Sequence, residues 1–369
     1  MNRFFQVSAI ALLVGALSSS SLAGSAPTAR AAENNKAQVT LSASSLSLPG
    51  ATDPRWISSG KLLVTVYDED GATDYLVDTN RNKAEPIIEG VSGIVVSADG
   101  ALGAYAAESG YVYLVDLETK TETVLVGTDT EKFELQFSAD GKTLYYIEGS
   151  KAAVIVALDL ETKKTTKIVD DKIENKMNLN VSDDGKRFLY AVETVGKTTV
   201  DSNASVDADA LEIDVSNANT HLYFYDKNMT KPGPYALLKG TDNKTSLSFW
   251  KKDNALYVSS DAEDPNARSV LKSLNLYTNA TYKFFNLTDV IKAEAQGDAV
   301  YVLGAKRSGK LQLYRIAKDT GLRKLLLSTD EAVTGFTVSP DGDVLVTVWG
   351  DEEESFFLLR DEQLVPVLN

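Results

Sequence analysis

The chain contains no cysteine and only one histidine, His221. Without cysteine there is no disulfide bond and no thiol nucleophile, so the fold must be stabilised by its hydrophobic core. One histidine excludes a zinc site with two or more His ligands, and a Ser-His-Asp triad would have to use His221. We interpret that residue as an ordinary strand-end residue, because it opens an apolar segment. The sequence also lacks a Gly-x-Ser-x-Gly motif, so these absences favour, without requiring, a protein that is not an enzyme.

Long apolar runs are scarce, and one lies at the start of the sequence. A basic start at residues 1–3 precedes the mostly apolar residues 4–17 and the small and polar residues 18–32. This order is typical of a secretory signal peptide, and the apolar run is shorter than the roughly 20 residues of a membrane span. Cleavage sites end at Ala23 and Ala31, and we favour Ala31 because charged residues follow it. Residues 1–31 therefore predict an exported bacterial protein, periplasmic, secreted or on the cell surface, with no transmembrane anchor in the mature chain.

No stretch shows a long helical period, whereas short segments rich in Val, Leu and Tyr recur with tight turns between them. The clearest turns have the pattern Ser-x-Asp-Gly, and Asp, Asn and Gly are the residues that such hairpin turns require. The seven turn residues are Gly60, Gly100, Gly141, Gly185, Asn254, Gly297 and Gly342. The steps between them are 40, 41, 44, 69, 43 and 45 residues.

A period near 40 residues with four strands in each copy is the signature of a β-propeller blade. Seven blades of about 42 residues fit the chain once an insertion of roughly 25 residues in the fourth copy is set aside. We therefore predict an all-β, seven-bladed β-propeller of four-stranded antiparallel blades over residues 54–369, with the insertion at 196–220 in blade 4. The blade starts are expected near Arg55, Ile94, Glu134, Met177, Ser246, Ile291 and Gly335. Residues 32–53 are expected to be a linker, with residues 38–48 apolar enough to clasp blade 7 or blade 1.

The nine residues from Ser138 to Tyr146, Ser-Ala-Asp-Gly-Lys-Thr-Leu-Tyr-Tyr, resemble the repeat of TolB-like propellers, and Ser182–Tyr190 is a second copy. A similar repeat occurs in the propeller domains of prolyl-oligopeptidase-like enzymes. The resemblance covers nearly the whole mature chain but concerns the fold alone, because such repeats serve proteins with unrelated functions. It implies the architecture and a bias towards protein or peptide binding, and it implies no catalytic residue.

The net charge of −15 makes nucleic acid and anionic lipid poor partners. In a propeller the loops between the second and third strands of all blades lie on one face, so acidic residues distant in sequence are expected to gather there. The candidate binding residues are Asp68, Glu69, Asp70, Asp261, Glu263, Asp264, Trp349, Asp351, Glu352, Glu353 and Glu354. The sixth loop is the basic exception, with Lys306, Arg307 and Lys310. The simpler explanation is solvated hairpin tips that keep an exported protein soluble, and the alternative is a docking surface for a basic partner or for cations.

The insertion at 196–220 alternates acidic and apolar residues, which suits an extended hairpin over this face. A loop of this length in a compact domain is usually functional or disordered, and the sequence leaves both open. Asp68, Asp70 and Asp74 form a candidate Ca²⁺ site, but they lack the ligand spacing of an EF-hand, and a plain acidic turn is the simpler interpretation. No other cofactor is expected.

Two classes of function follow from these residues. The first is an exported, non-catalytic propeller that binds a protein, a peptide or an envelope polymer through one acidic face. The second is a carboxylate-dependent glycan lyase or hydrolase acting at the mouth of the central channel. The single histidine and the missing hydrolase motif favour the first. A deep pocket with convergent carboxylates would favour the enzyme, and a broad shallow surface the binder.

Overall fold

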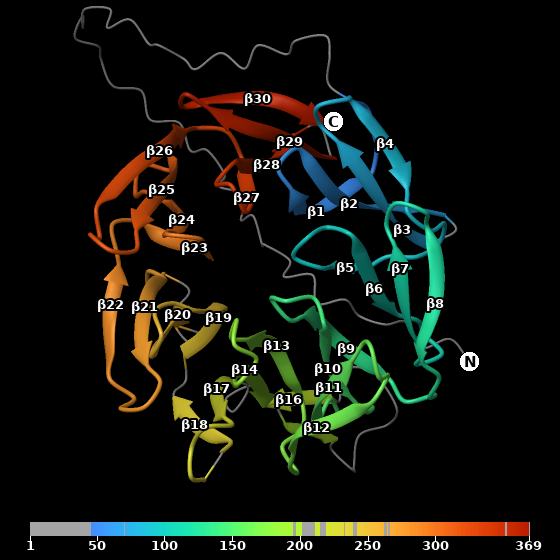
Figure 1. The fold of residues 1–369 in the computed structure, drawn as a ribbon. Coiled ribbons are helices and arrows are strands. Elements are labelled where there is room, and N and C mark those ends of the chain that lie inside the picture. Colours follow the sequence, from blue (N-terminus) through green and yellow to red (C-terminus); the bar gives the residue numbers. More distant parts are fainter. Residues whose placement is uncertain are drawn as a thin grey trace, which may run out of the picture. The chain divides into compact units, whose positions relative to one another are not determined.

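The computed structural model describes residues 46–69, 71–194, 197–200, 211–214, 219–231, 233–238, 242–261, 264, 266–350 and 353–368. Within these residues every regular element is a β-strand, and seven four-stranded antiparallel sheets are arranged in a ring about a common axis (Figure 1). This confirms the predicted seven-bladed β-propeller. No helix of the described part is long and apolar enough to span a membrane.

Each blade is formed by four strands, counted from the axis outwards. Blade 1 consists of β1 (Ala51–Ser58), β2 (Lys61–Asp68), β3 (Gly71–Asp78) and β4 (Lys83–Pro86). Blade 2 consists of β5 (Val95–Val96), β6 (Leu102–Ala106), β7 (Val112–Asp116) and β8 (Thr121–Val126). Blades 3 and 4 are β9 (Lys132–Phe137), β10 (Thr143–Glu148), β11 (Val154–Asp159), β12 (Thr165–Asp170), and β13 (Lys176–Val181), β14 (Arg187–Thr194), β17 (Asn219–Asp226), β18 (Tyr235–Leu238).

The remaining blades follow the same order. Blades 5 and 6 are β19 (Asp242–Phe249), β20 (Asn254–Asp261), β21 (Val270–Asn275), β22 (Thr281–Phe285), and β23 (Asp289–Gln296), β24 (Ala299–Ala305), β25 (Leu311–Ala317), β26 (Arg323–Thr329). Blade 7 is β27 (Val333–Val338), β28 (Val344–Gly350), β29 (Glu353–Arg360) and β30 (Gln363–Leu368). The observed first strands begin within four residues of the expected blade starts.

The insertion in blade 4 contains two further strands. β15 (Lys197–Val200) and β16 (Leu211–Asp214) pair as an antiparallel ladder between β14 and β17, in register from Lys197↔Asp214 to Val200↔Leu211. A hairpin is therefore present where the alternating pattern suggested one. Residues 195, 196, 201–210 and 215–218 lie outside the described residues.

The Ser-x-Asp-Gly turns join the first two strands of a blade, and their chemistry is local. In blade 3 the hydroxyl of Ser138 donates a hydrogen bond to Asp140 Oδ1 at 2.6 Å, and the backbone N–H of Gly141 donates to the Ser138 carbonyl at 2.9 Å. Gly141 has φ = 69°, a conformation that glycine adopts without a steric cost. The Ser138 hydrogen bond lowers the pKa of Asp140. The repeated motif is thus explained by turn geometry.

The hydrophobic core is divided into layers between neighbouring blades. One layer joins Tyr301 of blade 6 with Val346 and Phe357 of blade 7. Because side chains alternate along a strand, one strand serves two layers: on β2, Val64 packs towards blade 7 and Leu63 towards blade 2. Every blade is therefore held from both sides, and the layers continue around the ring.

The layer between blades 7 and 1 also receives the segment before β1. Leu46 forms a parallel bridge with Leu368, and its N–H donates to the carbonyl of Val367 at 3.1 Å. Leu46 and Leu48 pack against the buried residues of both blades. Residues 38–45 of the predicted clasp lie outside the described residues.

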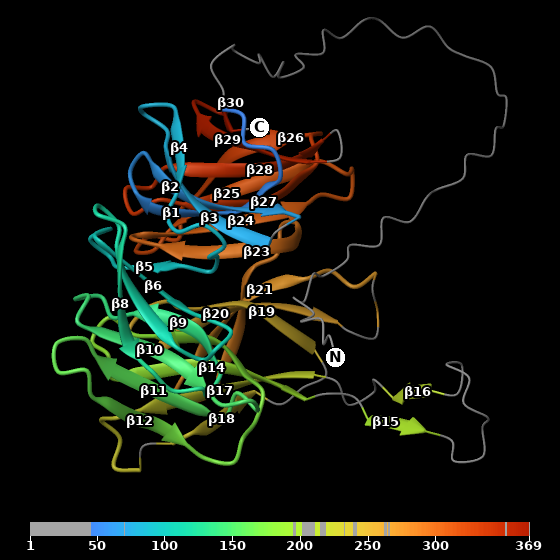
Figure 2. The ribbon, with the colours of Figure 1, turned by 90° about the vertical axis from the view of Figure 1, so that its right-hand side faces the viewer.

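The common order of the strands gives the ring two distinct faces, seen from the side in Figure 2. We name the strands of each blade A to D from the axis outwards. The loops between strands B and C share one face, here called the B–C face, and the turns between strands A and B share the opposite one, the A–B face.

Candidate binding site

The predicted site residues that the structure describes lie at loops of the B–C face. They are Asp68, Glu69, Asp261, Asp264, Trp349, Glu353 and Glu354. The other members of the set, which lie outside the described residues, are Asp70, Glu263, Asp351 and Glu352. Asp68, Glu69 and Glu353 are exposed, whereas Glu354 is half-buried.

Among the residues that the structure describes, three aromatic rings are exposed at this face, on three successive blades. Trp349 on blade 7 is 51% exposed, Tyr67 on blade 1 is 58% exposed and Tyr111 on blade 2 is 37% exposed. Trp349 is the cross-strand partner of Glu354, and Tyr67 directly precedes Asp68. Large aromatic side chains next to carboxylates are therefore presented to solvent along one sector of the propeller. Of these aromatic residues, only Trp349 was in the predicted set.

A small hollow of about 180 Å³ lies beside Glu354. It is lined mainly by the A strands of blades 6, 7 and 1, and its charged members are Asp53, Lys292 and Glu354. Burial raises the pKa of Glu354, and the negative charge of Asp53 raises it further. Lys292 Nζ donates to the carbonyl of Phe336 at 2.7 Å, which holds the ammonium group at the wall. Two carboxyl groups and an ammonium group thus converge at the axial side of the B–C face.

Arg55 connects this hollow to the interface of blades 1 and 2. Its Nε lies 3.3 Å from Asp53 Oδ2, and its Nη2 donates to Asp74 Oδ1 at 2.8 Å. Asp74 is fully buried, and its second oxygen accepts the N–H of Ile94 at 2.8 Å. The Asp74 carboxylate is therefore used in an ion pair within blade 1 and in a hydrogen bond to Ile94, the residue before the first strand of blade 2.

The candidate Ca²⁺ residues are not brought together where they are described. Asp68 lies at the hairpin tip, where its Oδ1 accepts the N–H of Gly71 at 3.0 Å. The cross-strand pair of Thr65 and Asp74 lies three ladder positions from the pair of Asp68 and Gly71. Because side chains alternate along a strand, Asp74 is on the side of the sheet opposite to Asp68. Asp70 lies outside the described residues, and within those that are described no cluster of three His, Cys, Asp or Glu could hold a metal. The Ca²⁺ site stays an untested prediction.

Three buried lysines join neighbouring blades under the B–C face. Lys132, Lys176 and Lys244 lie near the starts of the A strands of blades 3, 4 and 5, and their side chains are at most 1% exposed. Each ammonium group donates to a backbone carbonyl of the preceding blade. That carbonyl lies in the loop between strands B and C or at the start of strand C. These acceptors are Gly110 at 2.6 Å, Ala153, and Thr220 at 3.1 Å. Burial lowers the pKa of Lys132 and Lys176. Each ammonium group also lies within 4 Å of a carboxylate, so these cations are used within the fold and are not available to bind a ligand.

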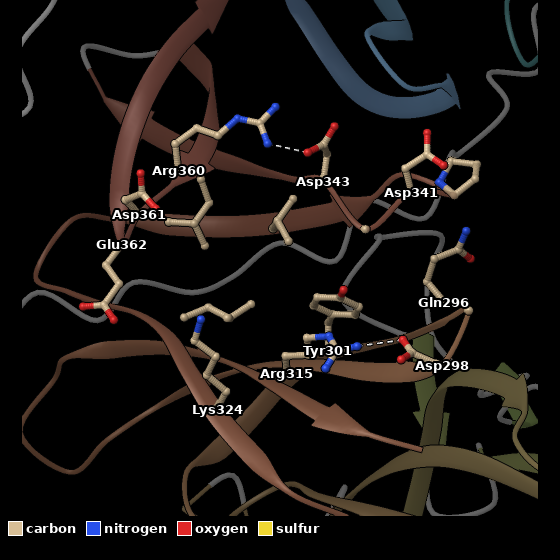
Figure 3. Close-up of a pocket in the computed structure, with 16 residues that line it drawn as sticks. Gln296, Asp298, Tyr301, Arg315, Lys324, Asp341, Asp343, Arg360, Asp361 and Glu362 are labelled. Atoms are coloured by element: carbon tan, nitrogen blue, oxygen red, sulfur yellow. Dashed lines mark hydrogen bonds and ion pairs between the residues drawn. The ribbon is translucent and has the colours of Figure 1, made fainter. Parts of the chain in front are cut away.

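The larger hollows lie on the A–B face, and no predicted site residue lines them. One, of about 560 Å³, lies between blades 6 and 7 (Figure 3). Its ion pairs are Arg315 with Asp298 at 2.7 Å and Arg360 with Asp343. A second, of about 680 Å³, extends from blade 4 to blade 6 and shares Gln296 and Gly297 with the first.

Sequence reasoning missed this second hollow, although one signal was present. In the fifth repeat the Ser-x-Asp-Gly pattern is replaced by Trp250-Lys251-Lys252-Asp253-Asn254. The turn needs only the Asp-Asn end of that segment, so the tryptophan and the two lysines are not explained by turn formation.

Comparison with known proteins identifies the class of fold and goes no further. No protein-family model and no curated protein matches the sequence, so membership of the TolB-like family stays a prediction. Solved structures do match. An oligogalacturonate lyase in complex with manganese has a TM-score of 0.58 at 16% identity, over 82% of this chain and 86% of that one. The β-propeller domain of the Trilobed protease from Pyrococcus furiosus has a TM-score of 0.57 at 14% identity, over 85% and 95%.

The tricorn protease has a TM-score of 0.55 at 14% identity, and the match covers 85% of this chain but 34% of that protein. The chain therefore spans about a third of the tricorn protease. These likenesses join proteins of unrelated activity, so they show a β-propeller and do not transfer a substrate or a partner.

Proposed function

We propose that the protein is an exported, non-catalytic propeller that binds a basic protein or peptide, or a basic envelope polymer, through its B–C face. The observation that carries this proposal is the sector of exposed rings, Trp349, Tyr67 and Tyr111, among the carboxylates of blades 7, 1 and 2. Exposed aromatic residues are the usual anchors of protein interfaces, and the surrounding charged rim selects the partner.

The charges around the rings favour a basic partner. Asp68, Glu69, Glu108 and Glu353 are exposed on the same three blades. The basic loop of blade 6 lies outside this sector. Its Lys310 forms an ion pair, with Nζ 3.1 Å from Asp330 Oδ2. Rim charges of one sign mainly accelerate association, and they do so less as salt increases.

The experiment is capture of envelope components on the immobilised protein, followed by binding kinetics with the component recovered. The test variant is Trp349→Ala with Tyr67→Ala, and the matched control is Tyr282→Ala, a ring of similar exposure, 53%, on the outer strand of blade 5. We expect the double variant to weaken binding at least about tenfold and the control to bind within about twofold of the wild type. Equal binding by all three proteins would contradict the proposal.

Charge is tested separately from ring contact. Glu353→Lys with Asp68→Lys should slow association and remove most of its salt dependence, while the dissociation rate changes little. Unchanged association across a salt series would leave solubility as the only role of these carboxylates.

A second function is favoured by one observation, the raised pKa of Glu354 beside Asp53 in the hollow that also contains Lys292. Two neighbouring carboxyl groups, one of them with a raised pKa, are the kind of pair that a glycan lyase or hydrolase uses. If the protein cleaves glycans, turnover of a panel of acidic and neutral oligosaccharides should be lost in Glu354→Gln and in Asp53→Asn. No turnover by the wild-type protein across that panel would count against the enzyme and leave the binding proposal standing.

A further inference from the structure

The 680 Å³ hollow of the A–B face has an unusual charge for this protein. Its charged lining consists of Arg187, Lys251, Lys252 and Lys318 against Asp183 and Asp319. The chain as a whole carries −15, and the adjoining 560 Å³ hollow has an excess of carboxylates. An excess of one sign of charge in a cleft attracts ions of the opposite sign, so four cations against two carboxylates in this hollow favour an anion.

The lysines at the centre of this hollow are not needed for the turn that carries them. The N–H of Asn254 donates to the Lys251 carbonyl at 3.1 Å and that of Trp250 to the Asn254 carbonyl at 2.8 Å. These are backbone bonds that any side chains at the tip would permit. Lys251 and Lys252 are exposed, and neither forms an ion pair with a carboxylate among the described residues.

The cations are placed by aromatic rings at both blade junctions. Between blades 5 and 6, Lys318 Nζ lies 5.2 Å and Lys251 Nζ 5.9 Å from the centre of the Trp250 ring. That ring is buried and packs edge-on against Phe284, with the centroids 5.3 Å apart, so its position is fixed. Lys318 Nζ also donates to the carbonyl of Gly297 at 3.4 Å. An ammonium group has three N–H donors, and contact with a ring face uses none of them as a hydrogen bond, so donors remain for an anion.

The junction of blades 4 and 5 is built in the same way. The Arg187 guanidinium lies 5.5 Å from the centre of the Phe249 ring, and its Nη1 donates to the carbonyl of Lys252. The Arg187 Nε also lies 4.0 Å from Asp184 Oδ1. Since a guanidinium has five N–H donors, some remain for a ligand. The hollow thus has two groups of cations, one at each junction.

We propose that this hollow binds a small oligoanion with at least two carboxylate or phosphate groups. Two groups of cations, one at each blade junction, match two anionic groups of one ligand, and a volume of about 680 Å³ lies in the range of small-molecule sites. The adjoining hollow, with Asp341, Asp361 and Glu362, repels anions, so it limits how far the negative charge of the ligand extends. The site lies on the face opposite to Trp349, so a ligand bound in it does not contact the rings of the B–C face.

The test is isothermal titration of the protein with tripolyphosphate and, separately, with citrate, at low salt and again at 0.3 M NaCl. The test variant is Lys251→Gln with Lys252→Gln. The matched controls are Lys324→Gln in the adjoining hollow and Lys306→Gln on the B–C face. Since Lys251 and Lys252 are exposed, loss of the fold is not expected, and Lys251→Arg with Lys252→Arg keeps the charge.

We expect the wild type to bind, and its affinity to decrease with salt. The affinity should fall at least about tenfold in the Gln double variant. In both controls and in the Arg variant it should stay within about twofold of the wild type. Binding of tripolyphosphate alone would assign phosphate as the ligand group, and binding of citrate would assign carboxylate. No binding of either probe, equal affinity of wild type and Gln double variant, or an equal loss in the Lys306→Gln control would overturn the proposal.

Discussion

Leu46 forms a parallel β-bridge with Leu368, so the segment before blade 1 is paired with the outermost strand of blade 7. Blade 7 already has four strands of its own, β27 to β30. Within the described residues the ring is therefore closed by this bridge and by the core layer of Leu46, Leu48 and their neighbours, and no strand is shared between the ends.

The first prediction concerns this closure. Leu46→Asp with Leu48→Asp should lower the free energy of unfolding by about 2–4 kcal/mol, because two carboxylates replace apolar side chains packed on the core. Ser47→Asp is the matched control, since Ser47 lies between them and is exposed. Chemical denaturation followed by tryptophan fluorescence measures the difference. Coincident transitions for the two variants would show that the clasp contributes no stability.

The second prediction concerns the buried lysines. Lys176→Met removes the donor to Asp171 Oδ1 at 2.8 Å and to the carbonyls of Ala153 and Ile173. Because buried acceptors without partners are costly, we expect a loss of about 2–4 kcal/mol. Lys142→Met, at an exposed turn, should change stability by less than about 0.5 kcal/mol. A Lys176→Met protein as stable as the control would mean that water replaces the ammonium group.

The third prediction is a pH effect at Glu354. Its pKa is raised in the folded protein from the ordinary 4.5, so the folded state binds more protons and stability must fall as pH rises through that interval. Glu354→Gln should therefore raise the melting temperature at pH 7 and remove this part of the pH dependence above 4.5. Glu353→Gln, exposed and adjacent, is the control. A lower melting temperature at pH 7 in Glu354→Gln would contradict the assignment of burial as the cause.

The fourth prediction concerns acid. Hydrogen bonds from serine hydroxyls lower the pKa values of Asp99, Asp140 and Asp184 from the ordinary 3.8. Their contribution to stability is present above that value and is lost as pH falls through the folded-state values. Changing all three to Asn should reduce the loss of stability between pH 4 and pH 2, measured by thermal unfolding. The same steep loss in the triple variant would assign acid unfolding to other carboxylates.

The repeat could be predicted from sequence because each blade carries its own local signal. Gly141 and its equivalents need positive φ, and Ser138 with Asp140 closes the turn through short-range hydrogen bonds. The enrichment of Val, Leu and Tyr in strands such as β2 is also local, so the number of blades and their starts followed from the spacing of these signals.

What could not be predicted depends on contacts between blades. Lys132 and Lys176 have the appearance of exposed residues at strand starts, yet loops of the preceding blade bury them. The position of Lys318 over Trp250 joins residues of different repeats, and no spacing within one repeat indicates it. Asp53 was likewise assigned to the linker, whereas it lies in β1 and contributes its charge beside Glu354.

Each blade consists of consecutive sequence, and Leu46 lies beside Leu368. A short peptide could therefore join the two ends of the propeller without moving a strand, and new ends could be opened in any loop that connects two blades. Such circular permutants would contain the same seven blades and the same core layers. They would differ only in which pair of neighbouring blades lacks a covalent connection. Comparing their free energies of unfolding would measure how much the connection at each junction contributes to stability.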